Sequence, residues 1–269
     1  MRRIVLLLGV VASSSCRTGA NYLDPVAPRW VGALPHVAPT RARVNTLQIV
    51  SFNIQLSLHI DSALAVLTMD PLVRHADILL LQEMDASATM RIARELGMAY
   101  VYYPAIQYFK TERAFGNAIL SRWPIEDDAK ILLPGRSRFG GTHRIAAAAT
   151  IRIAGRELRV YSTHLGTVAD MGPDGRRDQL QAILRDAERF ALVIIGGDMN
   201  SGTVGRYARE AGYSWPTDIG LKTVKFGQRY DHFFLKGLRI ARSNAVGMVA
   251  DKRGSSDHHP IWAEVVAVP

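Results

Sequence analysis

Short apolar runs, each bounded by polar or turn-forming residues, most restrict how this chain can fold. Runs of this length are typical of β-strands, whereas helices are usually longer. The predicted strands span residues 47–52, 77–81, 116–120, 145–153, 157–165, 192–195, 230–235 and 261–266. Between two of them, Ala154-Gly155-Arg156 favours a hairpin. One helical face would carry the apolar residues Leu180, Ile183, Leu184, Ala187 and Phe190. Strands interleaved with helices indicate an α/β domain of stacked layers.

Most of these strands end in side chains that can bind a metal ion or transfer a proton. The polar groups near the strand ends and the C-terminus are Asn53, Gln82-Glu83, Thr163-His164, Asp198-Met199-Asn200 and Ser256-Asp257-His258. Open α/β sheets assemble their sites at the carboxyl ends of strands. Taken singly, each residue also fits a structural role, because a carboxylate in a loop is usually just solvated. Their occurrence together and in this order is the informative observation.

A series of motifs gives the chain a family resemblance. The motifs are Ser51-Phe52-Asn53, Leu81-Gln82-Glu83, Gly116-Asn117-Ala118-Ile119-Leu120-Ser121-Arg122, Thr163-His164-Leu165, Gly197-Asp198-Met199-Asn200, Tyr230-Asp231 and Ser256-Asp257-His258. In this order they resemble the endonuclease/exonuclease/phosphatase superfamily, which includes deoxyribonucleases, abasic-site endonucleases, sphingomyelinases and inositol-phosphate phosphatases. The resemblance implies a four-layer α–β–β–α sandwich, with two packed mixed sheets flanked by helices. Tyr230 and His232 depart from the family pattern, which has an aliphatic residue and a tyrosine around the late aspartate.

The resemblance also implies a divalent-metal-dependent hydrolase of phosphate esters, and a phosphodiesterase in particular. Mg²⁺ or Mn²⁺ is the expected cofactor, since Mg²⁺ prefers hard oxygen ligands and takes few carboxylates from a protein. We predict Glu83 as the main metal ligand, with Asp257 and the Asn53 amide close to the same ion. Asn53 would also contact the substrate. The metal would polarise a phosphoryl oxygen and offset the charge of the transition state.

Catalytic roles follow from the same resemblance. Asp198 is expected to orient or deprotonate the attacking water. Asn200 lies two positions later, on the same side of an extended segment, and would hold the water or a phosphate oxygen. His258 and His164 would donate hydrogen bonds to phosphate oxygens. Asp231 would set the tautomer and charge of one of these two histidines.

Further residues match family positions. Asn117 is similar to the family amide that supports phosphate binding, and we predict that it contacts the substrate. Arg122 and Gln179 also match, although a salt bridge or a helix contact explains them equally well. His259 is expected to be structural.

Substrate choice is expected to depend on the loops at 104–114 and 134–143. Trp123, Trp215 and Phe139 could form a wall beside the substrate. Aromatic residues more often belong to the core, so packing is the competing interpretation for all three.

The N-terminus has the layout of a secretory signal peptide over residues 1–15. Arg2-Arg3 precedes the apolar run Ile4–Ala12, which is too short to span a bilayer. Cys16, the only cysteine, follows Ser13–Ser15 as in a bacterial lipoprotein signal, although such signals prefer Leu at position 13. Cleavage after Ala20 would instead discard Cys16, and Cys16 could also be incidental. We predict an exported protein at the periplasmic or extracellular face, held to the membrane by a lipid on Cys16.

The segment 16–45 is predicted to be a proline-rich tether that lies across the surface of the domain without forming a helix or strand. It contains Pro25, Pro28, Pro35 and Pro39. From residue 46 to residue 269 no linker, repeat or low-complexity run interrupts the chain. A single catalytic domain is therefore expected over 46–269, and we expect it to be a monomer.

The net charge of +9 favours anionic partners, although a generally basic soluble protein would have the same balance. Loss of Arg2 and Arg3 with the signal peptide leaves 9 − 2 = +7. The charge favours a nuclease, whereas the membrane anchor favours a phosphodiesterase of lipids or their headgroups. A non-catalytic binding protein with the same fold is the alternative to both. The retained acids argue against it, because clustered carboxylates repel one another.

Overall fold

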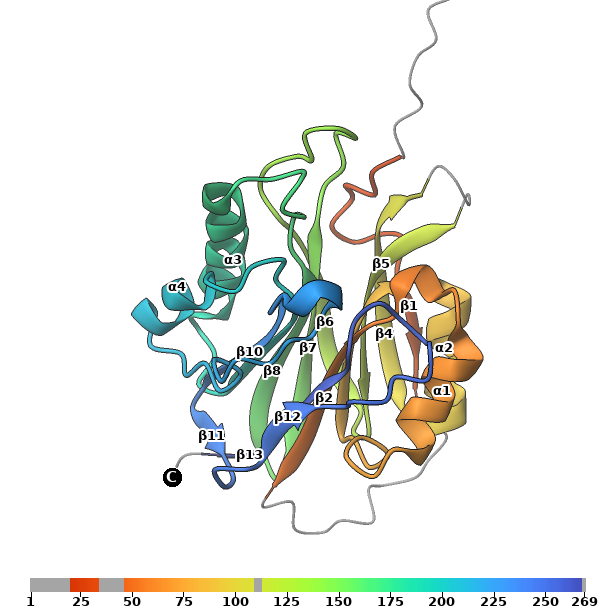
Figure 1. The fold of residues 1–269 in the computed structure, drawn as a ribbon, viewed down its shortest axis with the longest axis vertical. Coiled ribbons are helices and arrows are strands. Elements are labelled where there is room, and N and C mark those ends of the chain that lie inside the picture. Colours follow the sequence, from red (N-terminus) through yellow and green to blue (C-terminus); the bar gives the residue numbers. More distant parts are fainter. Residues whose placement is uncertain (1–19, 34–45, 109–112, 268–269) are drawn as a thin grey trace, which may run out of the picture.

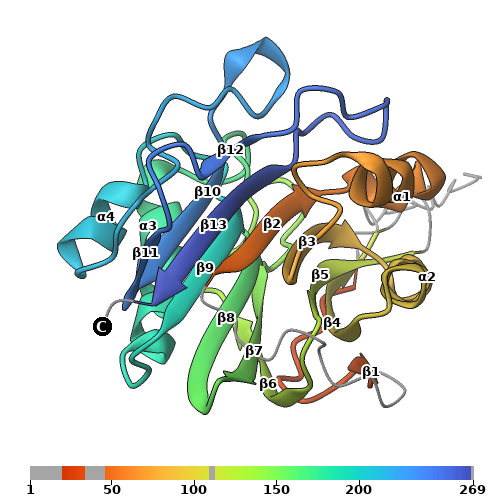
Figure 2. The same ribbon diagram turned by 90° about the horizontal axis from the view of Figure 1, so that it is seen from below.

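Two β-sheets lie face to face in the computed structural model, and helices cover their outer faces (Figure 1; Figure 2). The structure describes residues 20–33, 46–108 and 113–267. Among these residues no helix is long and apolar enough to cross a membrane. The signal peptide predicted for residues 1–15 and the predicted lipid site at Cys16 lie outside the described residues.

The first sheet has eight strands and the second has five. In spatial order the first contains β1 (Trp30–Gly32), β4 (Ala99–Gln107), β5 (Ala114–Ser121), β3 (Ile78–Met84), β2 (Leu47–Asn53), β13 (Ile261–Ala267) and β11 (Leu238–Ile240), with β12 (Val246–Met248) also paired to β13. The second contains β10 (Asp231–Lys236), β9 (Val193–Asp198), β8 (Arg156–His164), β7 (Ile145–Ile153) and β6 (Ile125–Leu132). The helices are α1 (Ile60–Met69), α2 (Ala86–Leu96), α3 (Pro173–Ala187) and α4 (Gly205–Glu210), with 3₁₀ turns η1 (Gln55–Ser57) and η2 (Lys225–Gly227).

Three clusters of buried apolar side chains hold the layers together. Successive residues of a strand point to opposite faces of its sheet, so a fully buried strand serves two clusters. Leu80 packs between the sheets, while Leu79 packs under α1 and α2. In the second sheet, Ile194 packs between the sheets and Ile195 under α3 and α4. The predicted four-layer α–β–β–α sandwich of two mixed sheets is confirmed.

Each sheet contains one parallel pair of strands among antiparallel neighbours. In the first sheet β2 and β3 run parallel, with Asn53 beside Gln82. In the second sheet β8 and β9 run parallel, with His164 beside Asp198. Because parallel strands end at the same edge, each pair delivers its terminal polar side chains to one place.

Residues 20–33, which belong to the segment predicted to be a tether, pair with β4 of the first sheet. The expectation that it forms no strand was wrong, since Trp30–Gly32 is β1 and pairs antiparallel with β4. The physical reason is that β4 would otherwise have an unpaired edge, whose backbone groups favour pairing with another strand.

Asn21 joins two parts of the chain that the sequence separates widely. Its backbone pairs with Ile106 at the end of β4. Its side-chain Nδ2 donates to the Gly141 carbonyl at 3.1 Å, and the His143 N–H donates to its Oδ1 at 2.7 Å. The start of the described chain therefore bridges β4 and the loop between β6 and β7, which we call the 133–144 loop.

Candidate active site

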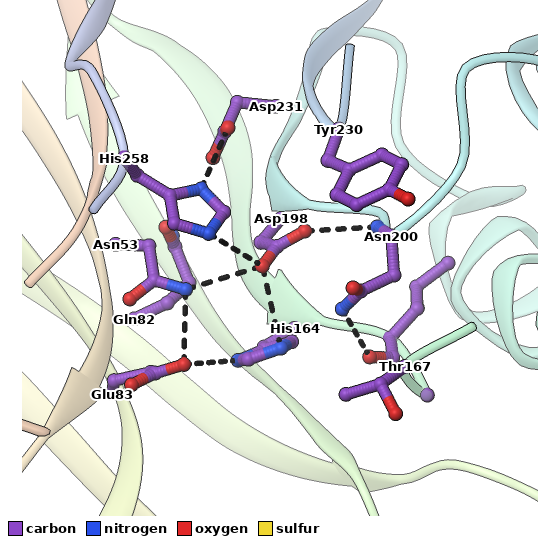
Figure 3. A network of polar contacts seen from close by, with 12 residues as sticks. Asn53, Gln82, Glu83, His164, Thr167, Asp198, Asn200, Tyr230, Asp231 and His258 are labelled. Carbon is purple, nitrogen blue, oxygen red and sulfur yellow. Dashed lines mark hydrogen bonds and ion pairs between the residues drawn. The ribbon is translucent and has the colours of Figure 1, made fainter. Parts of the chain in front are cut away.

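The two parallel pairs meet at one edge of the sandwich and bring polar residues from both sheets together (Figure 3). Asn53 and Glu83 come from the first sheet, and His164 and Asp198 from the second. Asn53 Nδ2 links the two sheets, since it donates to Glu83 Oε1 and to Asp198 Oδ2, each at 3.1 Å. Strand ends distant in sequence thus form one polar cluster.

Glu83 reaches this cluster through an irregularity in β3. The pairing of β3 with β5 shifts between Leu81 and Met84. Glu83 lies within this shift at φ 57°, a left-handed conformation that is uncommon for a residue with a side chain and carries a conformational cost. Its Oε2 accepts a hydrogen bond from the Leu56 N–H at 3.0 Å. Burial raises the pKa of this carboxyl, while the hydrogen bond from Asn53 opposes the rise.

Asp198 and His164 face each other because a glycine allows β8 and β9 to approach closely. Gly197 has φ 146°, and a side chain there would place its Cβ 1.9 Å from the Thr163 carbonyl oxygen. The next pair in register is His164 and Asp198. The glycine before Asp198 is therefore a geometric requirement of the site.

His258 lies between two carboxylates. Its Nδ1 donates to Asp231 Oδ2 at 2.9 Å, and its Nε2 is 3.6 Å from Asp198 Oδ2. Burial works to lower the pKa of His258, but the charges of Asp231 and Asp198 and the Asp231 hydrogen bond outweigh it and raise the pKa to about 10. Burial raises the pKa of Asp198 to about 7, against the opposing charge of His258. Asp231 is thus the hydrogen-bond partner of His258, and His258 is the histidine that it orients.

His164 is held in the neutral form. Burial lowers its pKa well below the ordinary value, and the charges of Arg144 and His258 lower it further. Its Nε2 is 3.4 Å from Asp198 Oδ2 and its Nδ1 is 3.7 Å from Glu83 Oε1. Because the imidazole is uncharged, these contacts are not ion pairs, and His164 can offer a single N–H donor.

Asn200 borders the same pocket as Asp198, but the predicted alternation along an extended segment does not explain its position. The strand β9 ends at Asp198, and Asn200 has a left-handed φ of 46°. Its backbone N–H turns back to donate to Asp198 Oδ1 at 2.9 Å, and its Nδ2 donates to the Leu165 carbonyl at 3.1 Å. The hydrogen-bonded turn, rather than alternation along a strand, places Asn200.

The acids of the cluster offer two arrangements that could hold a cation. Asp198, Asp231 and His258 bring ligand atoms within 4.8 Å of one another. A charged imidazole cannot ligate a metal, however, and Asp231 keeps His258 charged. Glu83 and Asp257 are the better set, because both border the pocket and the charge of Asp257 adds to burial, the main cause, in raising the pKa of Glu83. Within the described part of the chain, neither carboxylate is hydrogen-bonded to a cationic side chain, and two such hard carboxylates suit a divalent ion.

The Asn53 amide is turned differently from the arrangement predicted for a metal ligand. Its nitrogen faces Glu83 and Asp198, whereas its Oδ1 accepts a hydrogen bond from the Gln55 N–H at 3.1 Å. The structure therefore places Asn53 as a donor that connects the carboxylates. It does not place the amide oxygen toward Glu83.

A pocket of about 660 Å³ opens over the cluster. Its lining includes Glu83, His164, Asp198, Asn200, Asp257 and His258, together with Arg144, Tyr230 and residues of the 133–144 loop. Sequence reasoning missed Arg144. It precedes β7, which runs antiparallel to β8, so the amino end of β7 lies at the edge where β8 ends. A rule that inspects only carboxyl ends overlooks such positions.

Arg144 supplies positive charge to the pocket. Burial lowers the pKa of its guanidinium, opposed by the charges of Glu83, Asp198 and Asp170, yet an arginine remains protonated at neutral pH. Its guanidinium lies 5.4 Å from the centre of the Phe115 ring. The cation is thus available for an anionic group bound beside Glu83 and Asp198.

Asn117 does not line the pocket, so the structure does not place its side chain in direct contact with a substrate. The side chain is buried, and its Nδ2 donates to the Ile145 carbonyl at 2.9 Å. Ile145 directly follows Arg144 in the chain. The amide can therefore support phosphate binding only indirectly, by holding the segment that carries Arg144.

The remaining candidates are structural, apart from Phe139. Arg122 Nε donates to the Ala76 carbonyl at 2.8 Å. Gln179 joins two loops, since it accepts from the Gly166 N–H at 2.8 Å and donates to the Pro134 carbonyl at 3.1 Å. Three further side chains are buried or bonded to backbone away from the pocket, namely Trp123, Trp215 and His259. Phe139 borders the pocket and is 74% exposed.

Comparison with known proteins identifies the family. Residues 50–258 match the model of the Endonuclease/Exonuclease/phosphatase family, and the chain belongs to that family. Its members are generally hydrolases of phosphate esters and generally use divalent metal ions. No curated protein matches the chain in sequence.

Solved structures of this family have the same fold. The human nocturnin catalytic domain with a bound sulfate anion gives a TM-score of 0.68 at 17% identity, covering 83% of this chain and 95% of that one. D. rerio TDP2 in complex with a single-strand DNA product gives 0.63 at 16% identity, covering 82% and 98%. A family protein from Beutenbergia cavernae DSM 12333 gives 0.65 at 16% identity, covering 83% and 72%. At these identities the likeness concerns the fold alone.

Proposed function

We propose that this chain is a divalent-metal-dependent phosphodiesterase, with Mg²⁺ or Mn²⁺ as its cofactor. The observation that carries the proposal is one pocket bordered by a carboxylate pair, a buried carboxylate and two cationic side chains. These are Glu83 with Asp257, Asp198, and His258 with Arg144. Hydrolysis of a phosphodiester needs these groups, because the anionic phosphate repels a nucleophile until positive charge offsets the charge of the phosphate.

Glu83 and Asp257 would hold the divalent ion. When bound, the ion polarises a phosphoryl oxygen and offsets developing negative charge. Arg144 and the charged His258 border the same pocket and would bind the other phosphate oxygens through charge-assisted hydrogen bonds. The phosphate would thereby be fixed with its phosphorus atom facing Asp198.

Asp198 would accept the proton of the attacking water. The water oxygen forms a bond to phosphorus, the bond from phosphorus to the ester oxygen breaks, and the leaving oxygen takes a proton from solvent. A general base works best when its pKa is near the working pH, and burial raises the pKa of Asp198 to about 7. Asn200, fixed by the turn at the end of β9, would orient the water.

A hydrolysis screen tests this function. Plasmid DNA, RNA, sphingomyelin, phosphoinositides and bis(p-nitrophenyl) phosphate would be incubated with the protein in Mg²⁺ or Mn²⁺. We expect hydrolysis of at least one diester, its loss in EDTA and its return when either metal is added. Full activity after exhaustive chelation would contradict the metal-dependent mechanism. Binding without hydrolysis of any ester would favour the non-catalytic alternative.

We also propose that the protein is exported and tethered to a membrane through a lipid on Cys16. The support is the sequence alone, namely the basic start, the short apolar run and the position of Cys16. Cells would be labelled with a radioactive fatty acid, and the wild type compared with Cys16→Ser. Label in the wild type only is expected. Equal label in both would remove the lipid from the proposal and leave export open.

A further inference from the structure

Two loops that border the pocket present exposed phenylalanines to solvent. Phe139, at 74% exposure, lies in the 133–144 loop, and Phe226, at 87%, lies in the segment 214–230 before β10, which we call the 214–230 loop. Both loops line the pocket, through Phe139 in one and Val224 and Tyr230 in the other. Figure 2 shows the 214–230 loop projecting beyond the sheets. Exposed phenylalanines beside a functional pocket mark a surface that another molecule can cover.

The backbone holds Phe226 outward at a conformational cost. It has φ 68° within η2, and left-handed backbone is rare for a bulky residue. The loop is nevertheless well fastened. Val224 forms a bridge with His258, the His259 N–H donates to the Thr223 carbonyl at 2.8 Å, and the Val224 N–H donates to the Gln228 carbonyl at 3.2 Å. A strained and fastened turn that exposes an aromatic ring is better explained by binding than by stability.

Both phenylalanines are surrounded by basic residues. The exposed cations are Arg136 and Arg138 in the 133–144 loop, and Lys222, Lys225 and Arg229 in the 214–230 loop. No Asp or Glu occurs from residue 129 to 156 or from 219 to 230. Lys225 Nζ lies 5.2 Å from the centre of the Phe226 ring.

Some arginines elsewhere on the surface are paired with acids, whereas others, such as the exposed Arg156 and Arg239, have no described ion pair. Arg29, Arg91, Arg152 and Arg242, on other parts of the surface, all form ion pairs with acids. Within the described ranges, the five loop cations form none with a described acid. The positive charge of the two loops is therefore not paired with a described acid and is available to an external anion.

We propose that the 133–144 and 214–230 loops form a docking surface for an anionic phospholipid bilayer. Phenylalanine side chains partition into the boundary between headgroups and acyl chains, while neighbouring lysines and arginines attract lipid phosphates. Docking by both loops would place the pocket against the headgroup layer. The inference that phospholipid headgroups are the substrate rests on the proposed hydrolysis. The docking of the loops to the bilayer does not depend on it.

The start of the described chain supports a membrane over a nucleic acid. The Ala20 carbonyl accepts from the Gln107 N–H at 2.8 Å, and Asn21 holds Gly141 and His143. Gln107 and His143 border the pocket, so the tether reaches the domain at the pocket itself. Cys16 lies four residues earlier, which an extended chain spans in about 14 Å at most. An anchor at that position would hold the pocket close to the bilayer.

The test measures binding without catalysis. The full chain carrying Cys16→Ser and Asp198→Asn, in EDTA, would be sedimented with vesicles of phosphatidylglycerol and phosphatidylcholine, and with phosphatidylcholine alone. We expect binding to the anionic vesicles, and a loss of about tenfold or more in Phe139→Ala/Phe226→Ala. Met90→Ala, at an exposed apolar position on α2, is the matched control and should bind as the parent does.

A second pair of variants separates local from net charge. Lys222→Gln/Lys225→Gln should weaken binding to anionic vesicles more than Arg156→Gln/Arg239→Gln, although both remove two charges. Equal vesicle binding by the parent and the phenylalanine variant would overturn the docking surface. The docking surface would also be overturned if the protein bound a single-stranded oligonucleotide but not vesicles, and if the same variants weakened binding to the oligonucleotide. Hydrolysis is absent from these measurements, so failure of the proposed enzymatic function would leave their outcome unchanged.

Discussion

The carboxylates of the site are held in two different ways. Asp198 and Asp231 lie on either side of a charged His258 and are almost fully buried. Among the described residues, the Glu83 carboxylate accepts hydrogen bonds from two neutral groups, the Asn53 amide and the Leu56 N–H, and its neighbour Asp257 is exposed. The first group, which we call the histidine side, is electrostatically complete. On the Glu83 side, no described cation bonds to either carboxylate, since Lys252 Nζ donates instead to the Asp257 backbone carbonyl at 2.7 Å. A bound metal would complete this side.

The largest effect is expected from the histidine side. Asp198→Asn should reduce kcat by about 10²–10⁴-fold, because the amide cannot accept the proton of the water. Steady-state hydrolysis of the best diester from the screen measures this loss, and added metal should not recover it. Asp251→Asn makes the same chemical change at an exposed position and is the control. Recovery of the Asp198→Asn variant by metal would show that Asp198 belongs to the metal site.

His258 and Asp231 should behave as one unit. His258→Ala should lose activity that metal does not restore, and Asp231→Asn should lose less, since the imidazole remains. Because Asp231 acts through His258, the double variant should be no slower than His258→Ala. The comparison of kcat among the three variants measures the coupling. Losses that multiply would show that the two residues act independently.

A smaller and reversible loss is expected on the Glu83 side. Glu83→Gln keeps the size of the side chain but removes a negative ligand, so the metal should bind more weakly. Activity should fall at low Mg²⁺ and recover in part as Mg²⁺ is raised. Metal affinity, measured by calorimetry without substrate, should fall in parallel. Unchanged affinity would remove Glu83 from the metal site.

The last effects concern the stability of the fold, and the two sides should differ in sign. Without metal, Glu83→Gln should raise the unfolding free energy by about 1 kcal/mol, because it removes the cost of burying the Glu83 carboxylate and its repulsion with Asp257. Asp231→Asn should lower it by about 3 kcal/mol, because His258 loses its buried charged partner. Denaturant titration of the metal-free proteins measures both. A change of the same sign in both variants would abolish the distinction between the sides.

Much of the fold was predictable because buried strands leave a clear pattern. The predicted hairpin at Ala154-Gly155 joins β7 to β8 in the structure. The strand β4 was not predictable from the sequence pattern, since Pro104 lies within it and proline argues against an inner strand. The structure accommodates Pro104 at a shift in register between β4 and β5. The strand β6 was not predicted either, because Glu126 and Asp127 give this edge strand an exposed, loop-like composition.

The site was predictable where chemistry coincides with strand ends, as at Glu83 and Asp198. Arg144 was not, because it lies at the amino end of an antiparallel strand and follows no apolar run. The partner of His258 was open in the sequence, since only the three-dimensional contact selects Asp231 over other acids. The hydrogen bond between Asn117 and Ile145 was also not predictable from sequence patterns, because it joins residues of different sheets.

The strand β1 has a practical consequence for anyone who shortens this protein. Starting an expressed chain at residue 46, the boundary suggested by composition, would strip β1 from β4 and leave the hydrogen-bonding groups of β4 open along Tyr100–Tyr102. An open edge of this kind invites neighbouring copies to add on, which leads to association and precipitation. The cut would also remove Asn21 and release the 133–144 loop from β4. The shortest well-behaved version of the molecule should therefore begin no later than residue 20.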